Sequence, residues 1–206
     1  MDDSQFCSTQ HFERYNHHFE KTPIIQEQIV DLVKLKESFI PSCFEGRGWE
    51  KPIGDLPGVC EPLIREFYAN AIFRNEYSDC WVRGNEFTLE VRDIDGVLGH
   101  GHLDHEDFTL FKDRMLSIET VQSRIGGARE GKCLNTTTFP PDLRCLTYIM
   151  LFNLYSVRKM TTINNARAIF LMELHERTYI NIDAHVFSII VEATRTTSRP
   201  NLFSLV

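Results

Sequence analysis

The run His100-Gly101-His102-Leu103-Asp104-His105 has residue types and spacing that could perform metal chemistry. His100 and His102 stand at i and i+2, so in an extended segment their imidazoles face the same way and suit Zn²⁺. Asp104 and His105 would serve a second metal ion, and a water acidified between the two metals would be the nucleophile. The cluster supports one functional hypothesis, a metal-dependent hydrolase with zinc as its cofactor.

The same run resembles the HxHxDH zinc-ligand signature of metallo-β-lactamase-fold hydrolases, but the surrounding sequence departs from that family. The family surrounds its motif with long strands, whereas Asp93–Gly99 predicts a helical turn. Glu106 and Asp107 stand where the family has small residues. The later histidines, His175 and His185, fall on or beside predicted helices. We therefore interpret the cluster as a solvated loop and keep the hydrolase as the alternative hypothesis.

Other catalytic patterns find no support in the sequence. It contains no GxSxG, P-loop or GxGxxG motif. Asp93 and Asp95 resemble the carboxylate pair with which a transposase holds two metals, but a helix cap and a solvated turn explain them more simply. Cys80, beside Trp81, is predicted to be a buried packing thiol. We predict no catalytic residue and favour a non-enzymatic protein.

Charge and composition restrict the class of partner. The chain has 206 residues and a formal net charge of −7, so it lacks the overall basic character of proteins that bind nucleic acid. Arg124, Arg129 and Lys132 form a local basic group, which Glu130 interrupts. We interpret that group as part of a solvated loop.

The cysteines and the N-terminal sequence indicate a compartment. The six cysteines lie far apart, with no CxxC pair, and the polar, acidic N-terminal sequence lacks the features of a secretory signal. No apolar run approaches the length of a membrane span. We expect free thiols in a soluble, intracellular protein, nuclear or cytoplasmic and not secreted, without a membrane partner.

The stretch Cys60–His105, which ends in the histidine cluster, is expected to be the structural centre of the chain. A helix begins at Pro62 and presents an apolar face that includes Phe67 and Tyr68, with polar side chains on the opposite face (Arg65, Glu66, Asn70, Arg74). Asp79–Val82 and residues 86–91 predict two strands joined by a turn at Arg83-Gly84-Asn85. Such a hairpin needs a helix to cover its apolar face. Asp93 is expected to cap a helical turn that Gly99 ends.

The remaining chain is expected to be mostly helical. Residues 1–22 predict a flexible N-terminal arm, and a helix is expected from Pro23 to Pro41. A loop rich in glycine and proline follows, with Trp49 as its anchor in the core. Further predicted segments are a short helix at 109–116, a surface loop at 117–138, and helices from Pro140, at 163–177 and at 183–194.

These elements predict a mainly α (α+β) fold with one small antiparallel hairpin, in a single helical domain at 23–206. The apolar residues Leu202, Phe203 and Leu205 at its end suggest truncation of a larger protein.

An ordered set of short motifs resembles the putative plant transposon protein domain family, which occurs in retrotransposon-related plant open reading frames. The resembling segments are Leu63–Asn70, Trp81–Gly84, Val97–Gly99, Leu146–Ile149, Asn153-Leu154, Ala168–Leu171 and Ile180–Ile182. The resemblance covers roughly residues 35–200, and there is a looser similarity to plant mobile domains. It implies transposon descent and a helical second half, and it carries no established catalytic residue.

The preferred functional hypothesis is a non-catalytic interaction module that binds protein or nucleic acid within a transposon-derived product. The expected partner surfaces are the hairpin residues Trp81, Arg83 and Asn85, and the basic group at 124–132.

Overall fold

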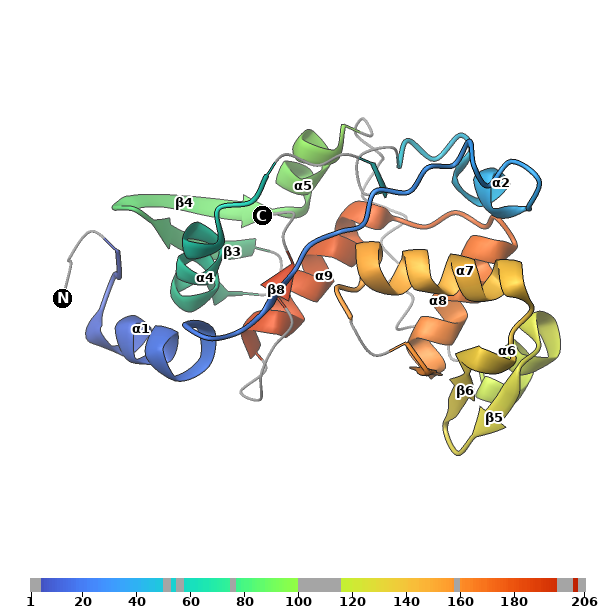
Figure 1. Cartoon of the computed structure of the whole chain (residues 1–206). Helices are drawn as coiled ribbons and strands as arrows, with labels where there is room; N and C mark the ends of the chain where they lie inside the picture. The colour runs from blue at the N-terminus through green and yellow to red at the C-terminus, as the bar shows by residue number, and fades with distance from the viewer. Residues whose placement is uncertain are drawn as a thin grey trace. The chain divides into compact units, whose positions relative to one another are not determined.

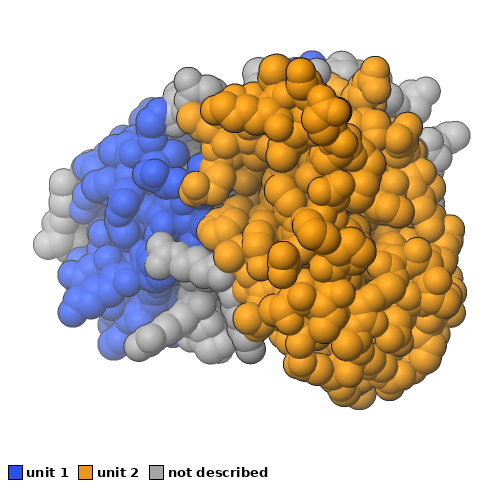
Figure 2. Space-filling model, turned by 45° about the vertical axis from the view of Figure 1, so that its right-hand side comes forward, with its two compact units in different colours: residues 1–27, 56–102, 183–206 blue, residues 28–55, 103–182 orange. Residues whose placement is uncertain are grey.

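The computed structural model describes residues 5–49, 53–54, 58–74, 77–99, 116–157, 160–195 and 202–203. The fold is mainly helical with small antiparallel sheets, which confirms the predicted α+β class (Figure 1). The chain forms two compact units (Figure 2), and the single domain over 23–206 stays a prediction. Unit 1 comprises 1–27, 56–102 and 183–206, and unit 2 comprises 28–55 and 103–182.

Unit 1 combines helices with a three-stranded antiparallel sheet in the order β2-β3-β4. Its elements are α1 (Thr9–Arg14), the π-helical turn η1 (Tyr15–Phe19), β1 (Ile24–Ile25), α4 (Glu61–Asn70), β2 (Ile72–Phe73), β3 (Tyr77–Val82), β4 (Asn85–Glu90), α5 (Val91–Leu98), α9 (Ile182–Arg195) and β8 (Leu202–Phe203). β1 and β8 pair in parallel. The predicted helix at Pro62, the hairpin and the C-terminal helix therefore all form.

The predicted N-terminal arm is a folded part of unit 1 where the structure describes it. Phe19 is almost fully buried and stacks on Tyr68 of α4, with ring centroids 6.1 Å apart. Phe6 is also buried and contacts the rings of Phe12 and Tyr15. The aromatic residues of the segment supply enough apolar surface to dock it, so the expectation of a flexible arm is wrong for residues 5–22.

Arg14 joins three helical segments of unit 1. Its guanidinium donates to the carbonyls of Ala69 (3.2 Å) and Ala71 (3.0 Å) at the end of α4, and to that of Thr194 (2.5 Å) at the end of α9. Carbonyls in the last turn of a helix lack intrahelical donors and carry partial negative charge, so a cation suits both positions. Burial lowers the pKa of Arg14.

Unit 2 packs helices around a second antiparallel sheet, in the order β5-β6-β7. Its elements are α2 (Ile40–Phe44), α6 (Ile118–Ile125), β5 (Ala128–Glu130), β6 (Cys133–Asn135), the 3-10 turn η4 (Thr136–Thr138), α7 (Pro141–Ile149), the π-helical turn η5 (Met150–Leu154), β7 (Thr162–Asn164) and α8 (Asn165–His175). Pro141 stands in the first turn of α7, and Leu143 and Leu146 on this helix are buried, as predicted.

The segment 117–138, expected to be a surface loop, contains α6, β5, β6 and η4. Ser117 caps α6 by accepting a hydrogen bond from the Thr120 N–H. Gly126 (φ 79°) ends the helix, and Gly131 (φ 60°) lies in the turn between β5 and β6. The glycines mark the boundaries of elements too short to show a sustained hydrophobic period.

The helix expected between Pro23 and Pro41 does not form. β1 and a series of turns occupy this segment, and regular helix begins at Ile40. Ile29 and Val33, which carried the apparent helical period, are 70% and 77% exposed. The helical spacing of Ile29 and Val33 therefore does not mark the buried face of a helix. The expected anchor of the next loop is correct: Trp49 is buried and lies 6.2 Å from the Phe44 ring, centroid to centroid.

Candidate functional site

The histidine cluster His100–His105 lies outside the described residues, as does the helix predicted at 109–116. The two later histidines belong to different units: His185 is buried in α9, and His175 ends α8 with its ring edge-to-face on Phe39, at 4.9 Å. Within the described ranges, no group of three or more histidine, cysteine, aspartate or glutamate side chains could hold a metal ion.

The turn of the β3–β4 hairpin consists of Arg83 and Gly84, both at positive φ (51° and 80°). Two such residues between Val82 and Asn85 form the two-residue turn whose twist matches that of the strands. The side-chain amide of Asn85 donates to the Arg83 carbonyl at 3.2 Å. The turn is predicted correctly, but its left-handed Arg83 requires support from outside the hairpin.

Glu66 of α4 supplies that support. Its Oε1 accepts the Arg83 backbone N–H at 2.6 Å, and its Oε2 forms an ion pair with Arg83 Nε at 3.1 Å. The sequence analysis placed Glu66 on the exposed face of the helix, whereas it is 1% exposed. The main-chain donor at Oε1 and the charge of Arg83 near Oε2 stabilise a carboxylate at this depth, although Oε2 accepts no hydrogen bond from the described residues. The arginine expected at a partner surface thus also fixes the hairpin on α4.

Asn70, one turn later on α4, was also predicted to be exposed and is 1% exposed. Its amide nitrogen donates to the carbonyls of Trp81 (3.0 Å) and Gln5 (2.8 Å), and its oxygen accepts from the Cys7 N–H (3.4 Å). β2 is too short to reach Trp81 of β3, so no backbone N–H of β2 can bond the Trp81 carbonyl. The Asn70 side chain bonds this carbonyl instead.

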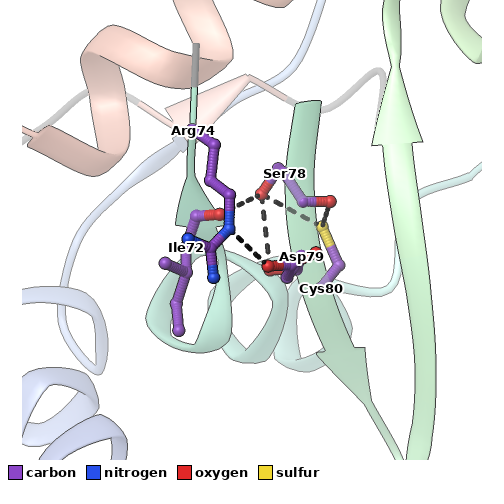
Figure 3. A network of polar contacts seen from close by, with 5 residues as sticks. All are labelled: Ile72, Arg74, Ser78, Asp79 and Cys80. Carbon is purple, nitrogen blue, oxygen red and sulfur yellow. Dashed lines mark hydrogen bonds and ion pairs between the residues drawn. The ribbon is translucent and has the colours of Figure 1, made fainter. Parts of the chain in front are cut away.

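The inner face of the β2-β3-β4 sheet is buried at Ser78, Cys80 and Leu89, whereas Phe87 on the same side is 42% exposed. Ser78 and Cys80 point to this side and are buried, and the thiol of Cys80 donates to Ser78 Oγ at 3.4 Å (Figure 3). Burial raises the pKa of Cys80 to about 11. The thiol therefore stays protonated near neutral pH, in agreement with the predicted role of a packing residue.

The opposite side of this sheet, here called the outer face, carries Ile72, Tyr77, Asp79, Trp81, Glu86 and Thr88. Ile72 and Tyr77 are 44% and 38% exposed, and Trp81 is partly exposed. Arg74 Nε donates to Asp79 Oδ2 at 2.9 Å beside them (Figure 3). The outer face is thus a mixture of exposed apolar rings, an aliphatic side chain and charged groups.

The basic group of unit 2 is largely neutralised by its own neighbours. Arg124 pairs with Glu176 of the α8 C-terminal end, and Arg129 of β5 pairs with Glu119 of α6. Lys132 lies exposed in the β5–β6 turn. Among Arg124, Arg129 and Lys132, one cation without an ion pair to the residues that the structure describes is a weak attraction for phosphates.

A cysteine–histidine contact that the sequence analysis missed lies at the start of α1. Cys7 Sγ is 3.2 Å and Ser8 Oγ is 2.8 Å from His11 Nδ1. Burial raises the pKa of Cys7 and, with the charge of Arg14, lowers the pKa of His11. Both shifts favour a neutral thiol and a neutral imidazole, so the pair is poorly suited to nucleophilic catalysis.

Unit 2 contains an apolar groove of about 360 Å³. It is lined by Leu32, Pro41, Phe44, Glu45, Trp49 and Ile53. The lining has one charged residue and lacks the convergent polar groups that orient a specific small ligand.

None of the helices in the described part of the chain is long and apolar enough to cross a membrane. No protein-family model, curated protein or solved structure matches this chain.

Proposed function

We propose that this chain is a non-catalytic module, derived from a plant transposon, that binds another protein through the outer face of the β2-β3-β4 sheet. The observation that carries the proposal is the exposure of Ile72 and Tyr77, with the partly exposed Trp81, on the side of the sheet opposite to the buried Ser78, Cys80 and Leu89. A cluster of apolar side chains left in water costs free energy that a protein partner would recover.

Charge favours a protein over a nucleic acid as the partner. Asp79 and Glu86 lie on the outer face, and the nearby Arg74 is already bonded to Asp79. In β5 and α6, Arg129 and Arg124 are paired with carboxylates. Phosphate binding requires cations free to replace counterions, and these arginines are engaged within the chain. The free thiols of all six cysteines fit the further proposal of an intracellular, nuclear or cytoplasmic location.

Paired variants in the full chain test the proposal. Ile72→Ser/Tyr77→Ser removes apolar surface from the outer face, and Ile29→Ser/Val33→Ser, at two positions that are more exposed still, removes apolar surface from unit 2 as the control. We expect quantitative co-purification from plant extract to show at least one protein that binds wild type and the control but is lost from the outer-face variant. Identical partners for all three chains would contradict the proposal.

The alternative proposal, a metal-dependent hydrolase, depends on the sequence pattern of His100, His102, Asp104 and His105. Metal analysis of untagged protein tests it independently. Near-stoichiometric zinc that is lost in the His100→Ala/His102→Ala variant would support it and would direct work to ester, lactam and phosphodiester substrates. Absence of retained metal would contradict it.

A further inference from the structure

We infer that the free edge of β4 binds an extended, basic segment of the partner as an additional antiparallel strand. This inference depends on the proposed function and names the partner chemistry that the outer face would recognise. It follows from the hydrogen-bonding pattern of the hairpin, the charges along β4 and the poor match of β4 to a second copy of itself.

The hairpin geometry decides which backbone groups of β4 are free. A two-residue turn makes Val82–Asn85 a hydrogen-bonded pair, and such pairs recur at every second residue. The main-chain groups of Phe87 and Leu89 therefore face β3, while those of Glu86 and Thr88 point away from the sheet. No strand in the described part of unit 1 pairs with that side of β4.

Both ends of this free edge are defined. Asn85 borders the hairpin turn, and at the other end the Glu90 N–H donates to Asp93 Oδ2 at 2.7 Å as part of the capping box of α5. The free N–H and C=O groups of Glu86 and Thr88 remain between them. An extended peptide satisfies such groups by strand addition, which is a recurrent mode of peptide recognition.

The charges on the edge favour a basic partner strand. Glu86 is directly opposite Trp81 in the β3–β4 pairing, so both side chains lie on the outer face. Glu86 has no ion pair with any other residue that the structure describes, whereas Glu90 pairs with Arg92 at 2.8 Å. A Lys or Arg in the added strand opposite Glu86 would gain an ion pair.

The same charges disfavour a second copy of β4 as the added strand. Antiparallel self-pairing about Thr88 places Glu86 of one copy opposite Glu90 of the other, and self-pairing about Glu86 places the two Glu86 carboxylates opposite each other. Self-pairing about Phe87 places Glu86 opposite Thr88, which avoids this repulsion but gives Glu86 no cation. Like charges opposite each other are destabilising, and acidic side chains on an edge are a known protection against self-association. Two of the three registers are therefore repulsive and none supplies a cation to Glu86, so a different, basic segment fits this edge better than a second copy.

Three capped synthetic peptides and the full chain test the inference by fluorescence anisotropy. The first alternates Lys with Val, the second alternates Glu with Val, and the third is the Lys–Val peptide with central prolines. We expect the first alone to bind. Glu86→Lys should weaken its binding by roughly tenfold, because it replaces attraction by like-charge repulsion, and the charge-matched Glu37→Lys in unit 2 should not. Thr88→Pro should abolish binding, because it removes a free N–H, whereas Thr88→Val should retain it.

Three results would overturn strand addition. They are absence of Lys–Val binding, equal binding of the proline peptide, which would indicate attraction by charge alone, and equal binding of the Glu–Val peptide. Self-association of the full chain that Thr88→Pro abolishes would assign the edge to a second copy and would also overturn it. If the peptides fail while Ile72→Ser/Tyr77→Ser still loses a protein from extract, strand addition is wrong and the proposed function stands. If both fail, both are wrong.

Discussion

β3 and β6 are each the central strand of a three-stranded antiparallel sheet, and each carries a cysteine, but different contacts stabilise the two sheets. β3 depends on buried polar groups of α4, through Glu66 and Asn70. β6 depends on an apolar side chain, Leu134, which is fully buried opposite Ile163 of β7. Strand length explains the difference. β3 has six residues and extends past the end of β2, so its unpaired backbone groups need side-chain partners. β6 has three residues, and one buried apolar side chain is enough to hold it.

The largest expected effect is on the unit 2 sheet. Leu134→Ala removes its central anchor and leaves a cavity, so we expect the free energy of unfolding to fall by about 3 kcal/mol. Phe87→Ala, a larger truncation at a position that is 42% exposed in β4, should cost distinctly less. Urea denaturation followed by far-UV circular dichroism measures both. Equal losses would show that β6 is not held by its apolar anchor.

The buried carboxylate of unit 1 gives the next largest effect. Glu66→Ala deprives the Arg83 backbone N–H of its acceptor and removes the ion pair, so we expect a loss of about 2 kcal/mol. The control is Glu119→Ala, which removes the exposed ion pair of Arg129 in unit 2 and should leave stability unchanged within error. If Glu119→Ala costs as much as Glu66→Ala, burial does not distinguish the two hairpins.

The sequence predicts the elements of unit 1 well because they are long enough to show a period. α4 has an apolar stripe, and β4 alternates Phe87 and Leu89 with polar residues, whereas β3 was predicted only from Asp79 to Val82. The sequence does not predict the burial of Glu66 and Asn70. A polar side chain that bonds the backbone of a distant strand has the same local sequence pattern as one that faces water. Only the three-dimensional meeting of α4 with the end of β3 distinguishes the two cases.

The misses in unit 2 have another physical cause. β5 and β6 have three residues each, and a three-residue strand shows too little alternation to be separated from a loop. Ile29 and Val33 show the opposite error, because their helical spacing occurs in a segment that buries neither side chain. The candidate site was predicted in part: Trp81 lies on the outer face, but its apolar neighbours Ile72 and Tyr77 were not identified.

One glycine in each unit shows how the two units also differ in backbone strain. Gly131 in the β5–β6 turn has a φ of 60°, so Gly131→Ala places a side chain in the left-handed region and should cost about 1 kcal/mol. Gly96 in α5 has an ordinary helical φ and open space at its Cβ position, so Gly96→Ala should stabilise by about 0.5 kcal/mol. Thermal unfolding should therefore shift in opposite directions; a shift of the same sign would contradict the assigned backbone conformations.

The remaining prediction concerns the two central cysteines and depends on pH. Because burial raises the pKa of Cys80 to about 11 from 9.0, the folded chain favours the neutral thiol. This contribution to stability is complete below pH 9 and is lost as the pH rises toward 11, since the unfolded thiol ionises first. Cys80→Ala should therefore lose less stability between pH 8 and pH 11 than wild type does, in urea denaturation at each pH.

Cys60→Ala, at an exposed position, controls for the general effect of alkaline pH and should follow wild type. At pH 8 the same environment should make alkylation of Cys80 by iodoacetamide much slower than that of the partly exposed Cys133 in β6. Equal alkylation rates would mean that β3 opens to solvent as readily as β6. The polar contacts of Glu66 and Asn70 would then fail to hold the longer hairpin closed, although they satisfy its backbone.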